Sequence, residues 1–233
     1  MAIPVEQVEA MFAAVDADDG EAIRGLISRR ADVVDAQRAS DGLSVLLYAM
    51  YRGKWELVDL IAPVHPGLDI FESAALGRSS RVKHLTTTNP DLLAKRSPDG
   101  WTALHLAAFF GQIGSVRTLI EKGANVDARS ENHLANCPLH AAAANRHLLV
   151  CELLIANGAD VNAQQHGGYT PLMAAGQHGD RGLAELFIRR GARRAIRSED
   201  GKTADLIAAE HGHAELAAYL SDQTGASGTP MRL

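Results

Sequence analysis

Cysteine is almost absent from this sequence, and so are long apolar runs. Only two of the 233 residues are cysteines, Cys137 and Cys151, which excludes a framework of disulfides and favours a reducing compartment. No stretch is apolar over the length that a membrane span requires, and the first residues lack a basic segment followed by an apolar one. We therefore expect a cytoplasmic protein with no signal peptide and no membrane partner.

Positive charge is scarce as well. The 23 lysines and arginines are outnumbered by 28 acidic residues, which gives a net charge of −5 and argues against a nucleic-acid partner. The one dense basic run lies between Arg189 and Arg197, and no aromatic residue is interleaved with its arginines to stack on bases. We interpret this run as a solvated edge beside Glu199 and Asp200, with a patch for an acidic partner or for nucleic acid as the alternative.

The combinations of residues that carry catalysis are missing too. The sequence has no glycine-rich phosphate loop and no recognisable pair of catalytic carboxylates. Neither cysteine has a basic neighbour to activate it, and the acidic turn at 16–21 lacks the spacing of a calcium loop. His211 and His213 lack a third metal ligand at suitable spacing. We predict no catalytic residue, no metal and no cofactor; an enzyme assembled from distant repeats is the least favoured alternative.

The sequence does contain a repeated pair of short helices, clearest at 99–123. Thr102 is a good N-cap for the first helix and Gly111 a good stop, and a second helix ends at Gly123. Apolar residues follow at helical spacing on one face of each helix: Leu104, Ala107 and Ala108 in the first, and Val116, Leu119 and Ile120 in the second. Helices this short cannot bury those faces alone, so they need copies on either side.

The copies are present in a single register. Residues 102–105 (TALH) recur as 137–140 (CPLH), 170–173 (TPLM) and 203–206 (TADL), at steps of 35, 33 and 33. The Gly-Ala pair that ends the second helix recurs at 123, 158 and 191 in the same phase. The chain resembles the ankyrin repeat family, whose repeat of about 33 residues carries a Thr-Pro-Leu-His-x-Ala core. The resemblance is clear over 99–222 and degenerate over 5–98.

The resemblance implies an all-α solenoid of about seven helix-turn-helix repeats with short β-hairpin loops. We expect a single array over 1–222 and a disordered tail at 223–233. Within the array, 1–40 is an N-terminal capping repeat, 41–66 and 67–98 are degenerate, 99–131, 132–164 and 165–197 are regular, and 198–222 is the C-terminal capping repeat. Pro63 and Pro66 cut the second repeat short, and the step from Ser44 to Asp69 is only 25 residues.

Two histidines and two cysteines occupy repeat positions. The resemblance gives His105 and His140 a structural role, in which they link neighbouring loops by hydrogen bonds; a metal or general-base pair is the alternative. Cys137 takes the place of the capping threonine, and Cys151 matches Val116 on a buried face. Both cysteines are therefore predicted to be small packed residues.

The resemblance also implies binding through the concave side, which the loop tips and the first helices form. The register places five of the eleven aromatic residues at positions that we expect to point outward: Tyr51, Trp101, Phe109, Phe110 and Tyr169. Polar residues at matching positions would form a rim: Asn136, Asn145, Gln177, His178 and Lys202. An aromatic centre with a polar rim is typical of protein interfaces. The alternative is that the irregular second and third repeats fold over Phe109 and Phe110 and bury them.

The sequence thus predicts a non-enzymatic protein–protein interaction module that acts as a monomer. Its partner is another protein, which the sequence does not identify. A regulatory subunit or inhibitor that blocks an enzyme through the same face is the alternative.

Overall fold

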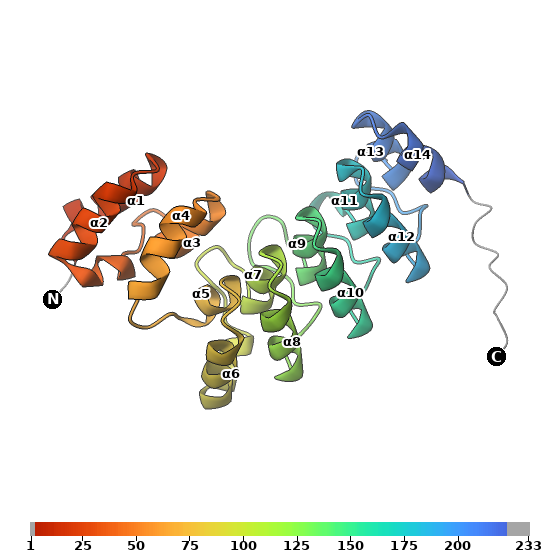
Figure 1. Cartoon of the computed structure of the whole chain (residues 1–233). Coiled ribbons are helices and arrows are strands. Elements are labelled where there is room, and N and C mark those ends of the chain that lie inside the picture. Colours follow the sequence, from red (N-terminus) through yellow and green to blue (C-terminus); the bar gives the residue numbers. More distant parts are fainter. Residues whose placement is uncertain (1–2, 223–233) are drawn as a thin grey trace.

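The computed structural model describes residues 3–222, so the predicted tail at 223–233 lies outside the described residues. Fourteen α-helices in this part of the chain form seven consecutive pairs. Figure 1 shows the pairs stacked side by side in chain order, as a curved solenoid. The all-α repeat architecture expected from the sequence is confirmed.

The helix pairs and the short 3-10 helices between them have the following bounds. The pairs are α1 (Val5–Asp16) and α2 (Gly20–Arg29), α3 (Val45–Tyr51) and α4 (Trp55–Ile61), α5 (Ile70–Ala75) and α6 (Ser79–Thr88), α7 (Ala103–Phe109) and α8 (Ile113–Glu121), α9 (Pro138–Ala144) and α10 (Leu148–Ala156), α11 (Pro171–His178) and α12 (Arg181–Arg189), and α13 (Ala204–Glu210) and α14 (Ala214–Ser221). The 3-10 helices are η1 (Ala31–Asp35), η2 (Ala62–Val64), η3 (Pro90–Leu93) and η4 (His166–Gly168).

Local capping chemistry sets the start of the first helices. At α7, the Thr102 hydroxyl accepts the backbone N–H of His105 at 3.3 Å, while the Thr102 backbone N–H donates to the His105 ring. These two bonds satisfy backbone donors that the first turn would leave without partners. Pro138 and Pro171 begin α9 and α11, where the missing N–H has no consequence.

Small side chains allow the first helices of successive repeats to approach closely. Ala107, Ala142 and Ala175 are completely buried where α7, α9 and α11 pack. At Gly176 in α11, an added Cβ would lie 2.5 Å from the carbonyl oxygen of Ala204 in the next repeat. Longer residues fill the space between first and second helices; Cys151, Leu154 and Phe187 are 0 % exposed there. Cys151 is therefore packed as predicted.

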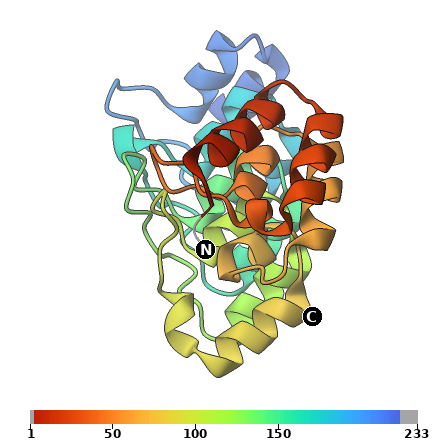
Figure 2. The ribbon, with the colours of Figure 1, turned by 90° about the vertical axis from the view of Figure 1, so that its left-hand side faces the viewer.

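The loops that connect one repeat to the next are tight turns rather than paired strands, and we call each of them a finger. Over residues 3–222 the pairing is limited to one isolated antiparallel bridge, between Gln37 and Ser44. The finger before α7 closes through a bond from the Ser97 N–H to the Trp101 carbonyl at 2.8 Å, and it receives the Glu131 N–H of the next finger on the Gly100 carbonyl, also at 2.8 Å. In Figure 2, which views the stack from its N-terminal end, the loops gather on one side of the helices.

The stack is irregular between the second and third repeats. Helix α4 ends at Ile61 and the chain passes through η2 to α5, as the two prolines predict. Figure 1 shows α1–α4 set apart from α5 and α6 by this connection. The side chain of His65 is buried there, with Nε2 at 3.4 Å from Asp35 Oδ1 and 3.6 Å from Glu72 Oε1. Burial and the nearby Asp69 raise the pKa of Glu72.

Candidate protein-binding site

Five aromatic side chains from the second and fourth repeats meet in one cluster. Ring centroids of Tyr51 lie 5.6 Å from Phe109 and 5.5 Å from Phe110. Phe109 also contacts Phe110 at 5.0 Å and Trp101 at 5.1 Å. Trp55 contacts Phe110 at 6.2 Å. We call Tyr51, Trp55, Trp101, Phe109 and Phe110 the aromatic cluster.

The cluster joins repeats that are not neighbours in sequence. Tyr51 and Phe109 are the last residues of α3 and α7, seven residues after the caps Ser44 and Thr102. The third repeat lies between them in the chain, yet their rings are in contact. The short α5 and the break at η2 therefore bring the inner faces of the second and fourth repeats together. The sequence left open that the irregular second and third repeats bury Phe109 and Phe110. In the structure both residues are half-buried, and Tyr51 and Trp55 of the second repeat contact the Phe110 ring.

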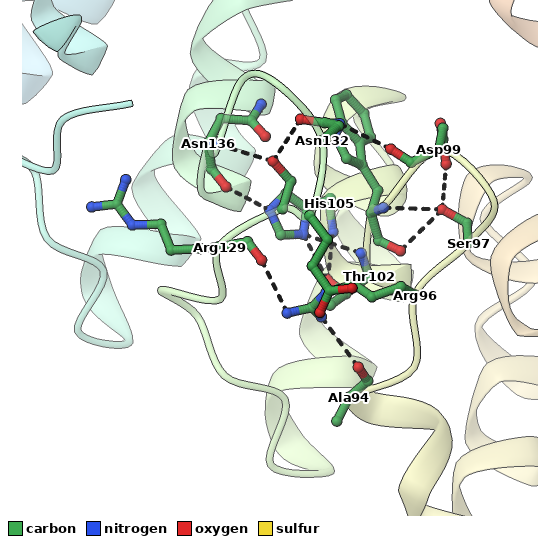
Figure 3. A network of polar contacts seen from close by, with 12 residues as sticks. Ala94, Arg96, Ser97, Asp99, Thr102, His105, Arg129, Asn132 and Asn136 are labelled. Carbon is green, nitrogen blue, oxygen red and sulfur yellow. Dashed lines mark hydrogen bonds and ion pairs between the residues drawn. The ribbon is translucent and has the colours of Figure 1, made fainter. Parts of the chain in front are cut away.

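A polar anchor fixes one edge of the cluster. The Tyr51 hydroxyl donates to Asp99 Oδ2 at 2.6 Å, and the Ser97 hydroxyl donates to the other oxygen of the same carboxylate. Burial and the Asp99 charge raise the pKa of Tyr51, so the phenol keeps the proton that it donates. Figure 3 shows Ser97 and Asp99 on the same finger, joined by their hydrogen bond. The position of Tyr51 is thus held by the fourth repeat.

The expectation that Trp101 and Asn136 point outward is wrong. Trp101 is 6 % exposed and Asn136 is 4 % exposed. The Trp101 ring packs on Phe109 and on the His105 ring, whose centroid is 5.8 Å away. The position before the cap turns inward here because the finger folds back on itself and stacks on its neighbour. Trp101 Nε1 and Asn136 Oδ1 have no protein partner within the described chain.

The two repeat histidines link neighbouring fingers, which confirms their expected structural role. His105 accepts the Thr102 N–H on Nδ1 at 3.3 Å, and its Nε2 lies 3.0 Å from the Asn136 carbonyl oxygen (Figure 3). His140 repeats this arrangement with the Cys137 N–H at 3.3 Å and the Tyr169 carbonyl at 3.1 Å. Burial lowers the pKa of each histidine to about 4. Both rings are therefore neutral at pH 7, with Nε2 as the donor.

The remaining rim residues lie further along the array. Gln177 and His178 are exposed at the end of α11, and Asn145 is half-buried, with its side-chain amide donating to the Ala141 carbonyl at 3.1 Å. Lys202 is half-buried and forms an ion pair with Glu210 at 2.6 Å. Tyr169 is half-buried on its finger and, within residues 3–222, makes no ring contact with the aromatic cluster. The structure therefore separates Tyr169 from the other aromatic candidates.

Exposed apolar residues were missed by the sequence reasoning. Trp55, Ile113 and Leu148 are the first residues of α4, α8 and α10, and they are 50 %, 39 % and 42 % exposed. Leu149 follows Leu148 and is 63 % exposed. The sequence signal for these residues is an apolar residue at the start of the second helix, directly after the turn between the two helices, in three repeats. We call these four residues, Trp55, Ile113, Leu148 and Leu149, the apolar ridge; Trp55 also belongs to the aromatic cluster through its contact with Phe110.

The polar groups considered for chemistry are occupied by structural contacts. Asp16 accepts the Tyr48 hydroxyl at 2.6 Å and pairs with Arg52 at 3.2 Å, and Asp18 pairs with Lys54 at 2.9 Å. Burial raises the pKa of Cys137 to about 11 and that of Cys151 to about 12, so both thiols are protonated at neutral pH. These contacts support packing and capping roles.

The basic run is tied to its own surface. Arg190 pairs with Glu152 at 3.4 Å, and Arg197 donates to the Gly201 carbonyl at 2.6 Å. The guanidinium of Arg194 lies over the Tyr219 ring at 5.6 Å from its centroid. These contacts favour the interpretation as a solvated edge. None of the helices described over residues 3–222 is long and apolar enough to cross a membrane.

Comparison with known proteins gives several partial matches. The chain is 38 % identical over 104 residues to the palmitoyltransferase Hip14 of Drosophila melanogaster, which covers 42 % of this chain and 16 % of that protein. It is 27 % identical over 150 residues to the putative ankyrin repeat protein FPV014 of Fowlpox virus, covering 57 % and 34 %. It is 32 % identical over 130 residues to the human neurogenic locus notch homolog protein 2, covering 55 % and 5 %. The chain thus spans about a third or less of the length of each of these relatives.

The family comparison covers more of the chain than any of these relatives does. A family model that describes ankyrin repeats in three copies matches residues 10–130, 70–165 and 139–230. These overlapping matches extend through both the regular repeats and the degenerate ones. Together with the seven stacked helix pairs, the capping boxes of α7, α9 and α11 and the linked fingers, they show that this chain belongs to the ankyrin repeat family.

Proposed function

We propose that this protein binds a partner protein at the aromatic cluster and the adjoining apolar ridge. Ankyrin repeats are protein–protein interaction modules. The observation that carries the proposal is that Tyr51, Phe109 and Phe110 remain only half-buried although they are packed together, and Trp55 is half exposed at their edge. Exposed apolar groups that are contiguous usually mark a contact surface.

The arrangement favours tight binding because the rings are already ordered. Tyr51 is held by its hydrogen bond to Asp99, and Phe109 lies against the buried Trp101. Fixed aromatic side chains offer a large contact area with little loss of entropy when a partner binds. Trp101 supports this surface from beneath, and the Asn136 carbonyl accepts a hydrogen bond from the His105 ring, on which Trp101 packs. Asn145, Gln177, His178 and Lys202 supply a polar rim toward the C-terminal repeats.

Binding at this face is compatible with two roles toward the partner. The first is a scaffold or targeting role, in which the partner keeps its activity. The second is a regulatory subunit or inhibitor that covers the active site of an enzyme with the same face. The activity of the captured partner, measured with and without this protein, separates them. We place the protein in the cytoplasm, which its two unpaired cysteines support.

The experiment is capture of the partner from the native cell, followed by titration with single variants. Phe110→Ala removes a half-buried ring, and we expect it to weaken binding on the order of tenfold to a hundredfold, as loss of an aromatic hot spot does. Leu206→Ala is the matched control, because Leu206 is 45 % exposed on α13, distant in the array from the cluster. Thermal unfolding of both variants is followed in parallel. Normal binding by Phe110→Ala, together with unchanged stability, would place the interface elsewhere.

A further inference from the structure

A cationic cavity opens at the irregular junction that precedes α6. It has a volume of about 590 Å³ and is formed by the connection from the second repeat and by the turn between α5 and α6. Its lining is His65, Pro66, Leu68, Gly77, Arg78, Ser79, Ser80 and Arg81. No carboxylate is among these residues, although the chain as a whole carries a net charge of −5. The two arginines are the fully charged side chains of this lining, and two carboxylates outside it, those of Asp35 and Glu72, lie 3.4 and 3.6 Å from His65 Nε2.

Arg81 occupies a position that other repeats bury. In five repeats the third residue of the second helix is buried. These second helices are α4, α8, α10, α12 and α14, and the residues are, in the same order, Leu57, Ser115, Val150, Leu183 and Leu216. In α6 that residue is the exposed Arg81. Stacking on the preceding repeat does not require an arginine here, and the short step between repeats has left space in front of it.

Both arginines have donors to spare. Within residues 3–222, neither Arg78 nor Arg81 forms an ion pair with a carboxylate. Arg81 donates to the Leu68 carbonyl through Nε at 3.2 Å, and this bond holds the side chain at the cavity while its two terminal nitrogens have no partner there. Most other arginines of the first two repeats are paired; Arg24, Arg38 and Arg52 each contact an aspartate or glutamate. Two arginines without a carboxylate partner in the described chain therefore line the same cavity.

We propose that this cavity binds a small phosphate monoester. Guanidinium groups match the geometry of phosphate oxygens, and the hydroxyl of Ser80 in the lining adds a further donor, whereas the Ser79 hydroxyl donates to the Gly77 carbonyl. Pro66 and Leu68 provide an apolar wall for the organic part of the ligand. The site lies apart from the aromatic cluster and does not depend on the protein-binding role.

Calorimetric titration with phenyl phosphate at low salt tests the proposal. We expect saturable binding with a dissociation constant on the order of 1 mM or tighter, and weaker binding of inorganic phosphate, which lacks a group for the apolar wall. Arg78→Gln and Arg81→Gln should each weaken binding roughly tenfold, because each removes a charged hydrogen bond to phosphate. Added salt should also weaken binding, since the attraction is between charges.

Arg117→Gln is the matched control, because Arg117 is an exposed arginine without a carboxylate partner in the described chain, located on α8 outside the cavity. Its variant should bind phenyl phosphate as the natural protein does. Thermal unfolding of all variants checks that the fold is intact. The proposal is overturned if binding of phenyl phosphate does not saturate at about 10 mM. It is also overturned if the Arg78→Gln and Arg81→Gln variants bind phenyl phosphate as tightly as the Arg117→Gln variant does.

Discussion

At the scale of single residues, buried histidines hold the regular repeats together in their neutral form. His105 and His140 each accept a backbone N–H from their own cap and donate to a carbonyl of the following finger. A proton on Nδ1 would abolish the first bond and place a charge in the interior. The folded protein therefore resists protonation of both rings, and their pKa of about 4 lies below the ordinary value of 6.5.

This difference predicts a loss of stability in mild acid. The unfolded chain takes up protons below pH 6.5, whereas the folded chain does so only near pH 4, so the stabilisation is complete above pH 6.5 and declines as the pH falls toward 4. Between pH 7.5 and pH 5 we expect each histidine to account for a loss of about 2 kcal/mol in the free energy of unfolding. Urea unfolding across this range measures it.

The control variant for this prediction is His140→Met, because Met173 fills the same position in the next repeat. It should lower stability at pH 7.5 by removing a finger-linking bond. It should also reduce the loss in the free energy of unfolding between pH 7.5 and pH 5 by the part that one histidine contributes. A variant with the same slope as the natural protein between pH 7.5 and pH 5 would show that His140 does not titrate in this way.

At the scale of helices, the turn inside each repeat requires a left-handed residue, and two repeats have a residue other than glycine there, Asp18 in the first and Arg146 in the fifth. Gly111 and Gly179 have φ values of 70° and 65° at this turn, whereas Arg146 adopts φ of 59° at the equivalent position. Arg146 also pairs with Asp180 at 2.9 Å, and Asp180 caps α12 through the N–H of Leu183. In the preceding repeat, glycine is required at this turn because a histidine ring of the next repeat packs on it. A Cβ added at Gly111 would lie 2.7 Å from the His147 ring.

We predict that Arg146→Gly is more stable than Arg146→Ala by about 1 kcal/mol, the reverse of the order inside a helix. Both variants lose the same ion pair, which contributes at most about 1 kcal/mol because Arg146 is 60 % exposed. Only glycine removes the strain of the left-handed conformation. Urea unfolding of the two variants gives the difference directly. Equal stabilities, or a more stable alanine variant, would contradict this account of the turn.

At the scale of the whole molecule, stability depends on each repeat being covered by the next. Helix α13 packs on α11, and α14 packs on α13, so the last pair covers the sixth repeat. Leu183 and Phe187, on the buried face of α12, are 0 % exposed in the intact protein. An array of this kind has few contacts that link distant repeats, so its ends must be closed by repeats with a polar outer surface.

Deletion of residues 200–233 should therefore expose apolar surface of the sixth repeat. We expect a lower unfolding temperature and association at micromolar concentrations, because the interface between α11 and α13 is lost. Light scattering and thermal unfolding measure the two effects. Deletion of residues 223–233 alone is the control and should change neither. A shortened protein that stays monomeric and equally stable without residues 200–233 would disprove the capping role.

The sequence by itself determined the repeat architecture, because its information is local. The cap at Thr102, the stop at Gly111 and the apolar spacing between them depend on neighbouring residues, and the same pattern recurs in phase. The register placed Cys151 on a buried face, and the resemblance to a known repeat assigned His105 its linking role. The copies found in that register supplied the packing partners that such short helices need.

Only the tertiary structure decided which surface residues meet. The course of the chain from Ile61 to Asp69 sets the angle between the second and third repeats, and that angle brings Tyr51 onto Phe109. A register identifies a position within a repeat, but the burial of its side chain depends on how closely the adjacent finger stacks. Trp101 was therefore predicted to point outward and is buried. The cavity beside Arg81 has the same origin, because it exists only where the spacing of the repeats is broken.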